Sequence, residues 1–350
     1  MMDFKSWKAD LERVLPHLQR VALGSAVVGI FPLSDRVALG LPRDQKLARE
    51  VIRLYRPMKW KARLFAHLLE GVSRTGVLRL FRSKGPGEMV PEISWLQGVS
   101  DLGFLGCHPG HGIRCVLLSR EEDGGLRVTK VAIGGKLAAV VAEGETLREL
   151  GARYRGVVTF GEAETGDGWA AFWTPHVAGK GPQSVLGEGV IDLLEGWLRP
   201  EKVTIGNLSW VEGLSRRLPE KTGERLKAQE IRAALVHGDF APWNLRGAPG
   251  GLVAIDWEWA REDGLGGLDI GHGLLMEALL VKGLAGADLV EAVLTGARQE
   301  GIAGYLERCG WGDLNLWCLL SLLYSGDQTG QEMARELTAL QNRMEQPSVI

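Results

Sequence analysis

Alternating apolar and polar positions predict several short β-strands in the middle third of the chain. The clearest are residues 113–119 and 126–132, which flank a Glu-, Asp- and Gly-rich turn at residues 121–125. This arrangement is typical of a β-hairpin. Residues 156–160 and 169–173 show the same alternation and are predicted to form a second strand pair.

Apolar residues at spacings of three and four predict helices, first at residues 137–150 and then through most of the chain after residue 179. The helices predicted after that point span residues 190–198, 209–218, 224–234, 273–284, 287–301, 314–323 and 332–343. One hairpin, with strands at residues 235–237 and 252–255, interrupts them. The pattern therefore predicts a small strand-rich lobe followed by a larger helical lobe.

The first 95 residues carry no recognisable chemical motif. Residues 46–54 and 59–69 have helical spacing, and Arg56-Pro57 between them predicts a break. We expect three parts, which are a basic, partly helical N-terminal extension (1–95), a strand-rich lobe (96–178) and a helical lobe (179–350).

The strongest chemical signal is the segment Leu-Val-His-Gly-Asp-Phe-Ala-Pro-Trp-Asn-Leu at residues 235–245. Four residues separate Asp239 from Asn244, and Asp256 follows twelve residues after Asn244. Four residues also separate the catalytic Asp from the Asn in a kinase catalytic loop. A carboxylate there accepts the proton of an attacking hydroxyl, and an amide oxygen with a second carboxylate suits Mg²⁺.

These residues resemble the aminoglycoside phosphotransferase and choline kinase family, distant relatives of protein kinases. The resemblance rests on the His-Gly-Asp…Asn loop at residues 237–244, on Ile-Asp-Trp-Glu at 255–258 and on Asp-Ile-Gly at 269–271. It implies an α+β, bilobal, protein-kinase-like fold, with an antiparallel sheet in the small lobe. It also implies ATP and Mg²⁺ as cofactors and a phosphotransferase activity.

The resemblance also implies roles for single residues. Asp239 would be the catalytic base, and Asn244 and Asp256 would be the metal ligands. His237 belongs to the catalytic motif, where a loop-packing role is favoured over direct participation. Asp269 would hold the loop in place.

In the small lobe the resemblance implies a strand lysine that grips the nucleotide phosphates and is paired with a helix glutamate. Lys130 lies in the predicted strand, whereas Lys136 follows two glycines outside it. Glu143 matches the helix pattern best, and Glu145 and Glu149 remain alternatives.

A glycine-rich loop at residues 106–112 precedes the first hairpin strand. Gly110 and Gly112 would allow the backbone to approach phosphate closely. Because the chain has 48 glycines, this signal is weak.

The segment at residues 172–177 falls where the resemblance places adenine. Thr174 and His176 are the nucleotide-binding candidates there. Pro175 between them lacks an N–H donor, which weakens the expected hydrogen-bonding pattern.

Only twelve residues separate Asp256 from Asp269, too few for the long activation segment of a protein kinase. We therefore expect a small-molecule hydroxyl acceptor. The acids Glu258, Glu262 and Asp263 are candidates for binding a cationic or hydroxyl-rich acceptor, and a solvated loop is the alternative. The acceptor itself is left open.

Composition and charge refine this picture. The chain of 350 residues is 45% hydrophobic and 24% charged, as expected for a packed protein. A net charge of −2 suggests no nucleic-acid partner. However, residues 43–84 hold twelve Lys or Arg against three acids, which gives this window +9. It is interpreted either as a cap on the small lobe or as a contact for an anionic membrane or a phosphate-bearing glycan carrier.

The four cysteines form no Cys-x-x-Cys pair, and the N-terminus lacks an apolar signal core. The longest apolar run, residues 21–33, is shorter than the ~20 residues of a membrane span. These features predict a cytoplasmic protein.

Two other functions fit the same motifs. The chain could be a non-catalytic nucleotide-binding module with a kinase-like shape, although the intact Asp239, Asn244 and Asp256 disfavour it. It could also transfer a different fragment of the nucleotide on the same fold.

Overall fold

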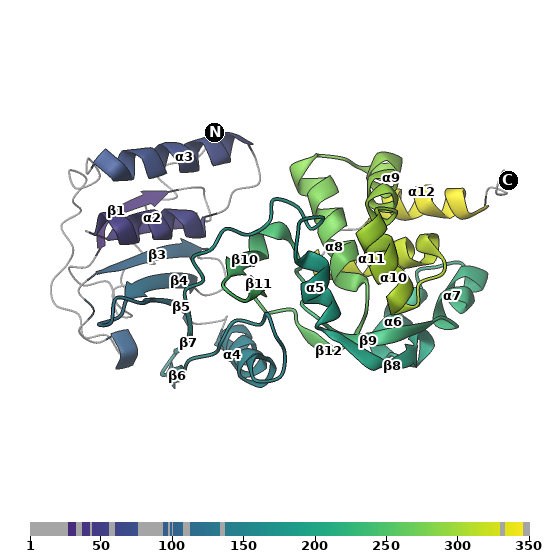
Figure 1. Cartoon of the computed structure of the whole chain (residues 1–350), viewed down its shortest axis with the longest axis horizontal. Helices are drawn as coiled ribbons and strands as arrows, with labels where there is room; N and C mark the ends of the chain where they lie inside the picture. Colours follow the sequence, from purple (N-terminus) through teal and green to yellow (C-terminus); the bar gives the residue numbers. More distant parts are fainter. Residues whose placement is uncertain are drawn as a thin grey trace. The chain divides into compact units, whose positions relative to one another are not determined.

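The computed structural model describes residues 27–32, 37–42, 44–55, 60–75, 94–96, 99, 101–107, 113–133, 137–329 and 333–345. The chain forms two compact units. Unit 1 comprises residues 1–152 and 158–178, and unit 2 comprises residues 153–157 and 179–350 (Figure 1). Unit 1 is built around an antiparallel sheet and unit 2 is mainly helical, so the predicted α+β class is confirmed.

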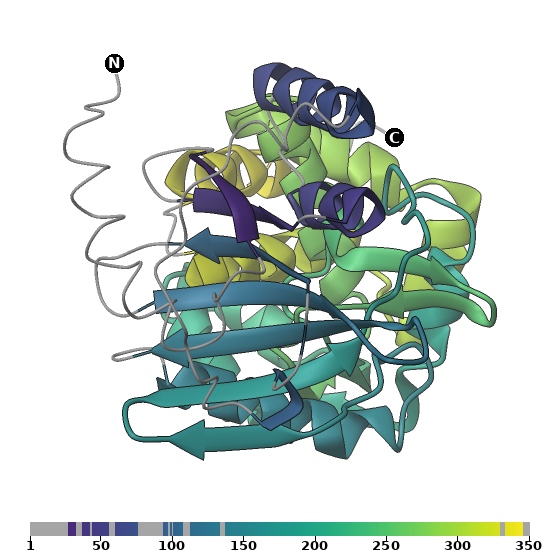
Figure 2. The same cartoon turned by 90° about the vertical axis from the view of Figure 1, so that its left-hand side faces the viewer.

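Among the described residues, the sheet of unit 1 has seven strands, and every neighbouring pair is antiparallel. In spatial order the strands are β1 (Val27–Pro32), β2 (Val37–Pro42), β3 (Leu102–Cys107), β4 (Ile113–Arg120), β5 (Leu126–Ile133), β7 (Trp169–Pro175) and β6 (Ala163–Gly166). Figure 2 shows them stacked in this order. The hairpin expected from the alternation at residues 113–119 and 126–132 is β4–β5.

The segment expected to form a separate N-terminal extension contributes to this sheet, because β2 pairs with β3. The helices α2 (Gln45–Leu54) and α3 (Trp60–Thr75) match the two helices that the sequence predicts there. Asp44 caps α2 by accepting the N–H of Leu47 at 2.7 Å, and it also accepts a hydrogen bond from Arg120 of β4 at 3.1 Å. These contacts join α2 to the sheet.

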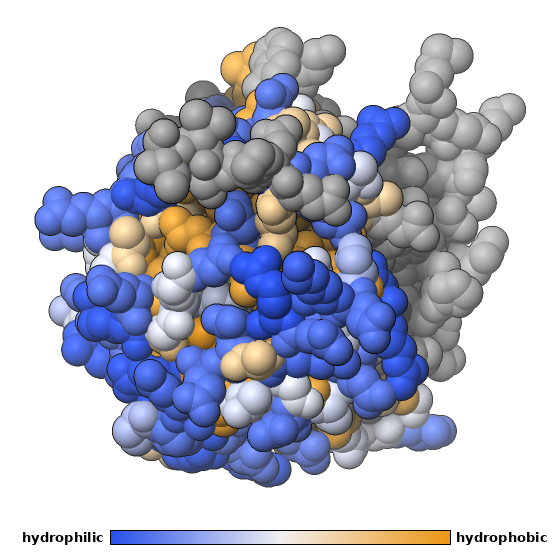
Figure 3. All heavy atoms as spheres, turned by 90° about the vertical axis from the view of Figure 1, so that its right-hand side faces the viewer, coloured by the Kyte–Doolittle hydropathy of each residue, from blue (hydrophilic) through white to orange (hydrophobic). Residues whose placement is uncertain are grey.

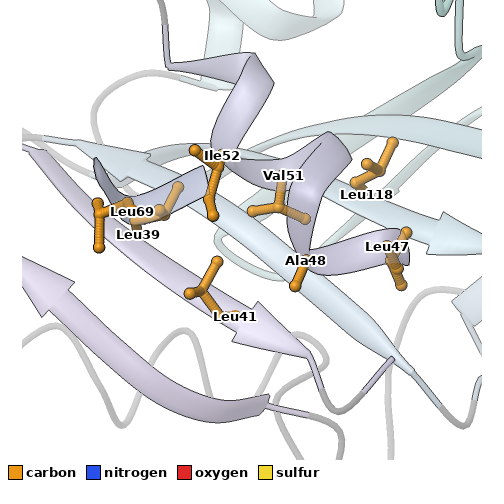
Figure 4. Close-up of a cluster of buried hydrophobic side chains, with 8 residues drawn as sticks. All are labelled: Leu39, Leu41, Leu47, Ala48, Val51, Ile52, Leu69 and Leu118. Carbon is orange, nitrogen blue, oxygen red and sulfur yellow. The ribbon is translucent and has the colours of Figure 1, made fainter. Parts of the chain in front are cut away.

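An apolar cluster fills the space between α2, α3 and the sheet (Figure 4). Burying a large aliphatic side chain contributes roughly 1.5–3 kcal/mol. The cluster therefore makes this region part of the core of unit 1. Its buried members are Leu39, Leu41, Leu47, Ala48, Val51, Ile52, Leu69 and Leu118.

The helix α4 (Leu137–Gly151) follows β5, close to the predicted bounds, and packs against β7. A Cβ at Gly144 would lie 3.3 Å from the ring of Phe172, so this glycine allows close packing. The strand predicted at residues 156–160 is absent, because that stretch forms only one isolated bridge at Val157. Its place opposite β7 is taken by β6, in a tight hairpin that turns at Gly168 (φ 76°).

Unit 2 combines helices with two small sheets. Along the chain its elements are α5 (Val190–Glu195), β8 (Leu198–Thr204), α6 (Ser209–Ser215), α7 (Glu220–Lys227), β9 (Glu230–Val236), β10 (Leu245–Ala248), β11 (Gly251–Ala254), β12 (Arg261–Leu265), α8 (Leu268–Met276), α9 (Gly286–Ala297), α10 (Glu300–Cys309), α11 (Leu314–Thr329) and α12 (Ala334–Glu345). A π-helical turn, Glu277–Val281, extends α8, and 3-10 turns lie at Ile205–Asn207 and Pro242–Asn244. A further 3-10 turn, Ser94–Leu96, belongs to unit 1.

The helix predicted at residues 287–301 is divided between α9 and α10, and two predictions around the Asp239 loop were wrong. Residues 224–234, expected as one helix, form the end of α7 and the start of β9. The strand leading into the Asp239 loop was expected to pair with residues 252–255, yet β9 lies between β8 and β12. The hairpin is instead formed by β10 and β11, both after the loop.

The face of the molecule drawn in Figure 3 is mainly hydrophilic, and its apolar side chains lie in small separate areas. In the described part of unit 2, the large apolar side chains with high exposure are Trp259 (48%) and Val281 (44%). No helix in the described ranges is long and apolar enough to cross a membrane.

Candidate active site

The loop of residues 237–244 leaves the end of β9 and is fixed by a buried carboxylate. Asp269, in the first turn of α8, accepts the backbone N–H groups of His237 (2.8 Å) and Gly238 (3.1 Å). Burial raises the pKa of Asp269 to about 6, and the two donors oppose that rise. Gly238 has φ 89°, and a Cβ there would meet the carbonyl oxygen of Trp259 at 2.4 Å. The turn therefore requires glycine.

His237 is fully buried, and both of its ring nitrogens are hydrogen-bonded to backbone groups. Its Nε2 lies 2.9 Å from the carbonyl oxygen of Ile255, and its Nδ1 accepts the N–H of Asp239 at 3.3 Å. A carbonyl only accepts, so Nε2 carries the proton and the ring is neutral. Burial lowers the pKa of His237, which favours the same state. The loop-packing interpretation fits this geometry better than a catalytic role.

Four aromatic rings hold the loop to the segment that follows β11. Trp257 lies 4.6 Å from His237 and 5.2 Å from Trp197 between ring centroids. Trp197 also packs edge-on against Phe240 at 5.8 Å. Such pairs stabilise by about 0.5–1.5 kcal/mol each beyond their burial. The loop and the following segment are thus anchored to one core.

Asp239 and Asn244 are in direct contact. The Asn244 side-chain amide donates to the backbone carbonyl and to Oδ2 of Asp239, at 2.8 Å in both cases. Both acceptors require a donor, so the amide nitrogen faces Asp239 and the amide oxygen faces away. That oxygen is the group expected to bind a metal ion. The carboxylate of Asp239 is 36% exposed and can reach a ligand.

Asp256 follows β11, and its backbone lies close in space to that of Asn244. The N–H of Ile255 donates to the carbonyl of Asn244 at 2.9 Å, which places the two predicted metal ligands on adjacent segments. Among the described non-glycine residues, Asp256 is the one with positive φ, at 71°. This conformation costs free energy for an L-residue. The chain therefore holds Asp256 in a strained backbone conformation.

One contact of Asp239 involves a residue to which the sequence assigned no role. His272, in α8, has its Nε2 3.3 Å from Oδ1 of Asp239, and its Nδ1 3.0 Å from Oγ of Ser325. His272 follows Asp269 by three residues. Helical residues three apart are surface neighbours, so this spacing was the signal that could have identified it.

In unit 1, Lys130 of β5 is ion-paired with Glu143 of α4, the glutamate that the sequence favoured. Glu145 and Glu149, the alternatives, are exposed. The Glu143 side chain is completely buried and also accepts a hydrogen bond from Arg114 at 3.2 Å. One buried carboxylate thus binds two cationic side chains. The sequence had not indicated the contact of Arg114.

Two other nucleotide-binding candidates of unit 1 lie at the β5–β7 strand pair. The backbone N–H of His176 donates to the carbonyl of Leu126 at 2.8 Å, so this donor is part of the hydrogen bonding between the strands. Thr174 is buried and lies opposite Val128 in the β5–β7 ladder. Gly110 and Gly112 fall outside the described residues.

The segment between Asp256 and Asp269 is short and folded. After Trp259 the chain enters β12, which pairs with β9. Two of the acids expected to bind a cationic acceptor are paired with arginines. Asp263 accepts from Arg261 at 2.9 Å, and Glu262 from Arg199 at 3.0 Å.

No model of a known protein family matches this chain, and no curated protein matches it. Among solved structures it is similar to aminoglycoside phosphotransferase APH(3'')-Id from Streptomyces rimosus, with 17% identity and a TM-score of 0.39 over 60% of this chain and 89% of that one. It is similar to the amicoumacin kinase hAmiN, with 13% identity and a TM-score of 0.36 over 67% and 87%.

A thermostable mutant of aminoglycoside phosphotransferase APH(4)-Ia gives 14% identity and a TM-score of 0.45 over 71% of this chain and 96% of that one. Two of these three proteins bear the name of the group that the sequence motifs resemble.

Proposed function

We propose that the protein is an ATP- and Mg²⁺-dependent phosphotransferase that moves the γ-phosphate to a hydroxyl of a small molecule. The observation that carries this proposal is the contact of Asn244 with Asp239 at 2.8 Å, together with the 2.9 Å backbone bond from Ile255 to Asn244. These two bonds bring a partly exposed carboxylate, an amide oxygen and the Asp256 segment to one place in unit 2.

The oxygen donors suit magnesium. Mg²⁺ prefers hard oxygen ligands and is commonly held by one or two protein groups together with phosphate oxygens and water. Within the described ranges, no group of three or more His, Cys, Asp or Glu is arranged to hold a metal. Asn244 and Asp256 would hold the ion jointly with the nucleotide. The ion would neutralise charge on the transferred phosphate.

The remaining roles belong to this chain's side chains. Asp239 accepts the hydrogen of the acceptor hydroxyl and orients that oxygen towards the phosphate. In unit 1, Lys130 binds nucleotide phosphate oxygens, and Glu143 orients its ammonium group. Such reactions depend mainly on positioning and on neutralising negative charge, which is what these groups supply.

The short segment between Asp256 and Asp269 supports a small acceptor. After Trp259 the chain returns to the sheet as β12, which leaves no long segment for docking a peptide. Trp259 is 48% exposed, and its backbone lies against Gly238, next to the proposed base. A half-exposed tryptophan whose backbone lies against Gly238 suits the apolar face of a sugar or a ring-bearing alcohol.

The decisive experiment is a transfer screen with ATP labelled at the γ-phosphate against a panel of amino alcohols, sugars, nucleosides and aminoglycosides. Label should move to an acceptor, and Asp239→Ala should lose about 10²–10⁴-fold of the rate. A parallel reaction with label at the α-phosphate tests transfer of another nucleotide fragment. Nucleotide binding without any transfer or hydrolysis would instead identify a non-catalytic module.

We further propose that residues 43–84 touch an anionic membrane surface through α3. Leu64, Phe65, Leu68 and Val72 lie on one helical stripe and are 38–59% exposed. The +9 charge of this window complements anionic headgroups. The apolar face of α2, by contrast, is buried on the sheet, as the cap interpretation expects.

Flotation with phosphatidylserine vesicles at low and high salt tests this contact, with phosphatidylcholine vesicles as the control. Binding should weaken with salt and be lost in Leu68→Asp. The matched variant Glu122→Gln, on the exposed β4–β5 turn, should still bind. Absence of binding at low salt would remove the membrane proposal without affecting the proposed reaction.

A further inference from the structure

A series of hydrogen-bonded side chains runs from the proposed base into the helical core of unit 2. His272 of α8 is 1% exposed, with Nε2 at 3.3 Å from Oδ1 of Asp239 and Nδ1 at 3.0 Å from Oγ of Ser325. Ser325 belongs to α11, 53 residues further along the chain. The contact depends on close helix packing, because a Cβ at Gly271 would meet Oγ of Ser321 at 2.2 Å.

We propose that His272 is a positioning residue, which donates its Nε2–H to Asp239 while Ser325 fixes its tautomer. This inference rests on the proposed function, in which Asp239 is the base. An ionised carboxylate only accepts hydrogen bonds, so the nitrogen facing it must carry a proton. In the neutral ring, Nδ1 is then an acceptor, and the hydroxyl of Ser325 donates to it.

The consequence is that each carboxylate oxygen of Asp239 has its own donor. His272 holds Oδ1, and the amide of Asn244 holds Oδ2 at 2.8 Å. Two donors on different elements, α8 and the loop, restrict rotation of the carboxylate about its side-chain bonds. The lone pairs not used by these donors remain for the acceptor hydroxyl. Phosphoryl transfer gains much of its rate from such positioning.

The proton position can be tested without any activity assay. In ¹⁵N-labelled protein at about pH 8, well above the ordinary imidazole pKa of about 6.5, long-range ¹H–¹⁵N correlation spectra report which ring nitrogens are protonated. The signals of His272 are those missing in His272→Gln. A protonated Nε2 is expected, and an unprotonated Nε2 would overturn the proposal. Ser325→Ala should raise the share of the opposite tautomer.

The kinetic test compares two substitutions at His272, with Mg-ATP hydrolysis and water as the acceptor. His272→Leu should lower kcat about 10–100-fold, as for the loss of one hydrogen bond to a charged group, with KM for ATP within about twofold. His272→Gln should restore most of kcat, because its amide nitrogen can reach the place of Nε2. Equal losses in the two variants, or a wild-type rate in His272→Leu, would contradict the role.

Two α11 variants complete the design. Ser325→Ala removes the partner of Nδ1 and should lower kcat a few-fold, which also serves as the test if His272→Leu does not fold. Asp327→Asn, exposed near the end of the same helix, should leave kcat unchanged. If wild type is active, Asp239→Asn is inactive and the His272 variants match wild type, the positioning role alone fails. If wild type neither hydrolyses ATP nor transfers phosphate, the proposed function fails.

Discussion

The side-chain amide of Asn244 donates to both the backbone carbonyl and the carboxylate of Asp239, at 2.8 Å each. The proposed metal ligand and the proposed base are therefore not independent groups. The two acceptors fix the amide nitrogen, and this orientation directs the amide oxygen away from the base. Any change that turns the amide should disturb metal binding and base orientation together.

Substitutions at Asn244 should separate the two effects. Asn244→Asp keeps an oxygen for Mg²⁺ but replaces the donor with an oxygen facing Oδ2 of Asp239. We expect Mg-ATP affinity within about tenfold of wild type and kcat about 10²–10⁴-fold lower. Asn244→Leu should lose both Mg-ATP affinity and kcat. Titration of a fluorescent ATP analogue with and without Mg²⁺, alongside steady-state kinetics, measures them. A wild-type kcat in Asn244→Asp would contradict the coupling.

Glu143→Gln should weaken nucleotide binding. The glutamine keeps the shape of Glu143 but cannot balance the charges of Lys130 and Arg114, which both bind this carboxylate. Hydrogen bonds to charged groups contribute about 1.5–3 kcal/mol, so affinity for ATP should fall about 10–100-fold. Calorimetric titration with ATP gives this value. Glu149→Gln, exposed on the same helix, is the control and should bind normally. An unchanged affinity in Glu143→Gln would argue against the role of Lys130.

The residues that the motif spacing selected as a candidate site lie together in the structure, because they stand on consecutive segments. The spacing of Asp239, Asn244 and Asp256 identified three residues that the structure brings to one loop and the strand pair after it. The choice of Glu143 also agrees with the structure, since that position on α4 faces Lys130. Both depend on separations of 13 residues or fewer between successive groups along the chain.

The sheet of unit 2 was not predictable in the same way. Residues 230–236, Glu-Ile-Arg-Ala-Ala-Leu-Val, contain good helix formers, yet they form the central strand β9 because β8 and β12 pair with it. The edge strand β8 contains Pro200, which obscures a strand pattern. In β12, Arg-Glu-Asp-Gly-Leu, no residue is β-branched or aromatic. Tertiary pairing outweighed local propensity in each case.

Residues that act across the fold were also missed. His272 reaches Ser325 over 53 positions, and Arg114 reaches Glu143 over 29. Both contacts exist only because elements far apart in sequence pack together. One sequence contains the residue types but not these pairings.

Asp256 should show a trade-off between stability and binding. Its φ of 71° is strained for any residue with a Cβ. Asp256→Gly and Asp256→Ala both remove the carboxylate, and both should lose Mg-dependent ATP binding. Only glycine relieves the strain, so Asp256→Gly should be about 1 kcal/mol more stable than Asp256→Ala. Chemical denaturation measures the difference. Equal stabilities would mean that the backbone relaxes at this position.

The buried carboxylate of Asp269 should make stability depend on pH. Burial raises its pKa to about 6 from the ordinary 3.8. Between these values the folded protein binds more protons than the unfolded chain, so the contribution of Asp269 to the free energy of unfolding falls as pH rises. This contribution is complete below the pKa of Asp269 in the unfolded chain, and it is lost as pH rises through the pKa of Asp269 in the folded protein. Two pKa units correspond to about 3 kcal/mol.

Comparison with Asp269→Asn isolates this effect, because asparagine does not titrate and keeps an oxygen for one of the two loop N–H groups. Urea denaturation at a series of pH values should show wild type losing about 3 kcal/mol relative to Asp269→Asn between about pH 3 and about pH 7. Asp192→Asn, exposed on α5, should give a curve parallel to wild type throughout. Parallel curves for Asp269→Asn would mean that the two N–H donors, from His237 and Gly238, fully offset the burial of this carboxylate. The loop would then rest on a fixed negative charge at all pH values in this range.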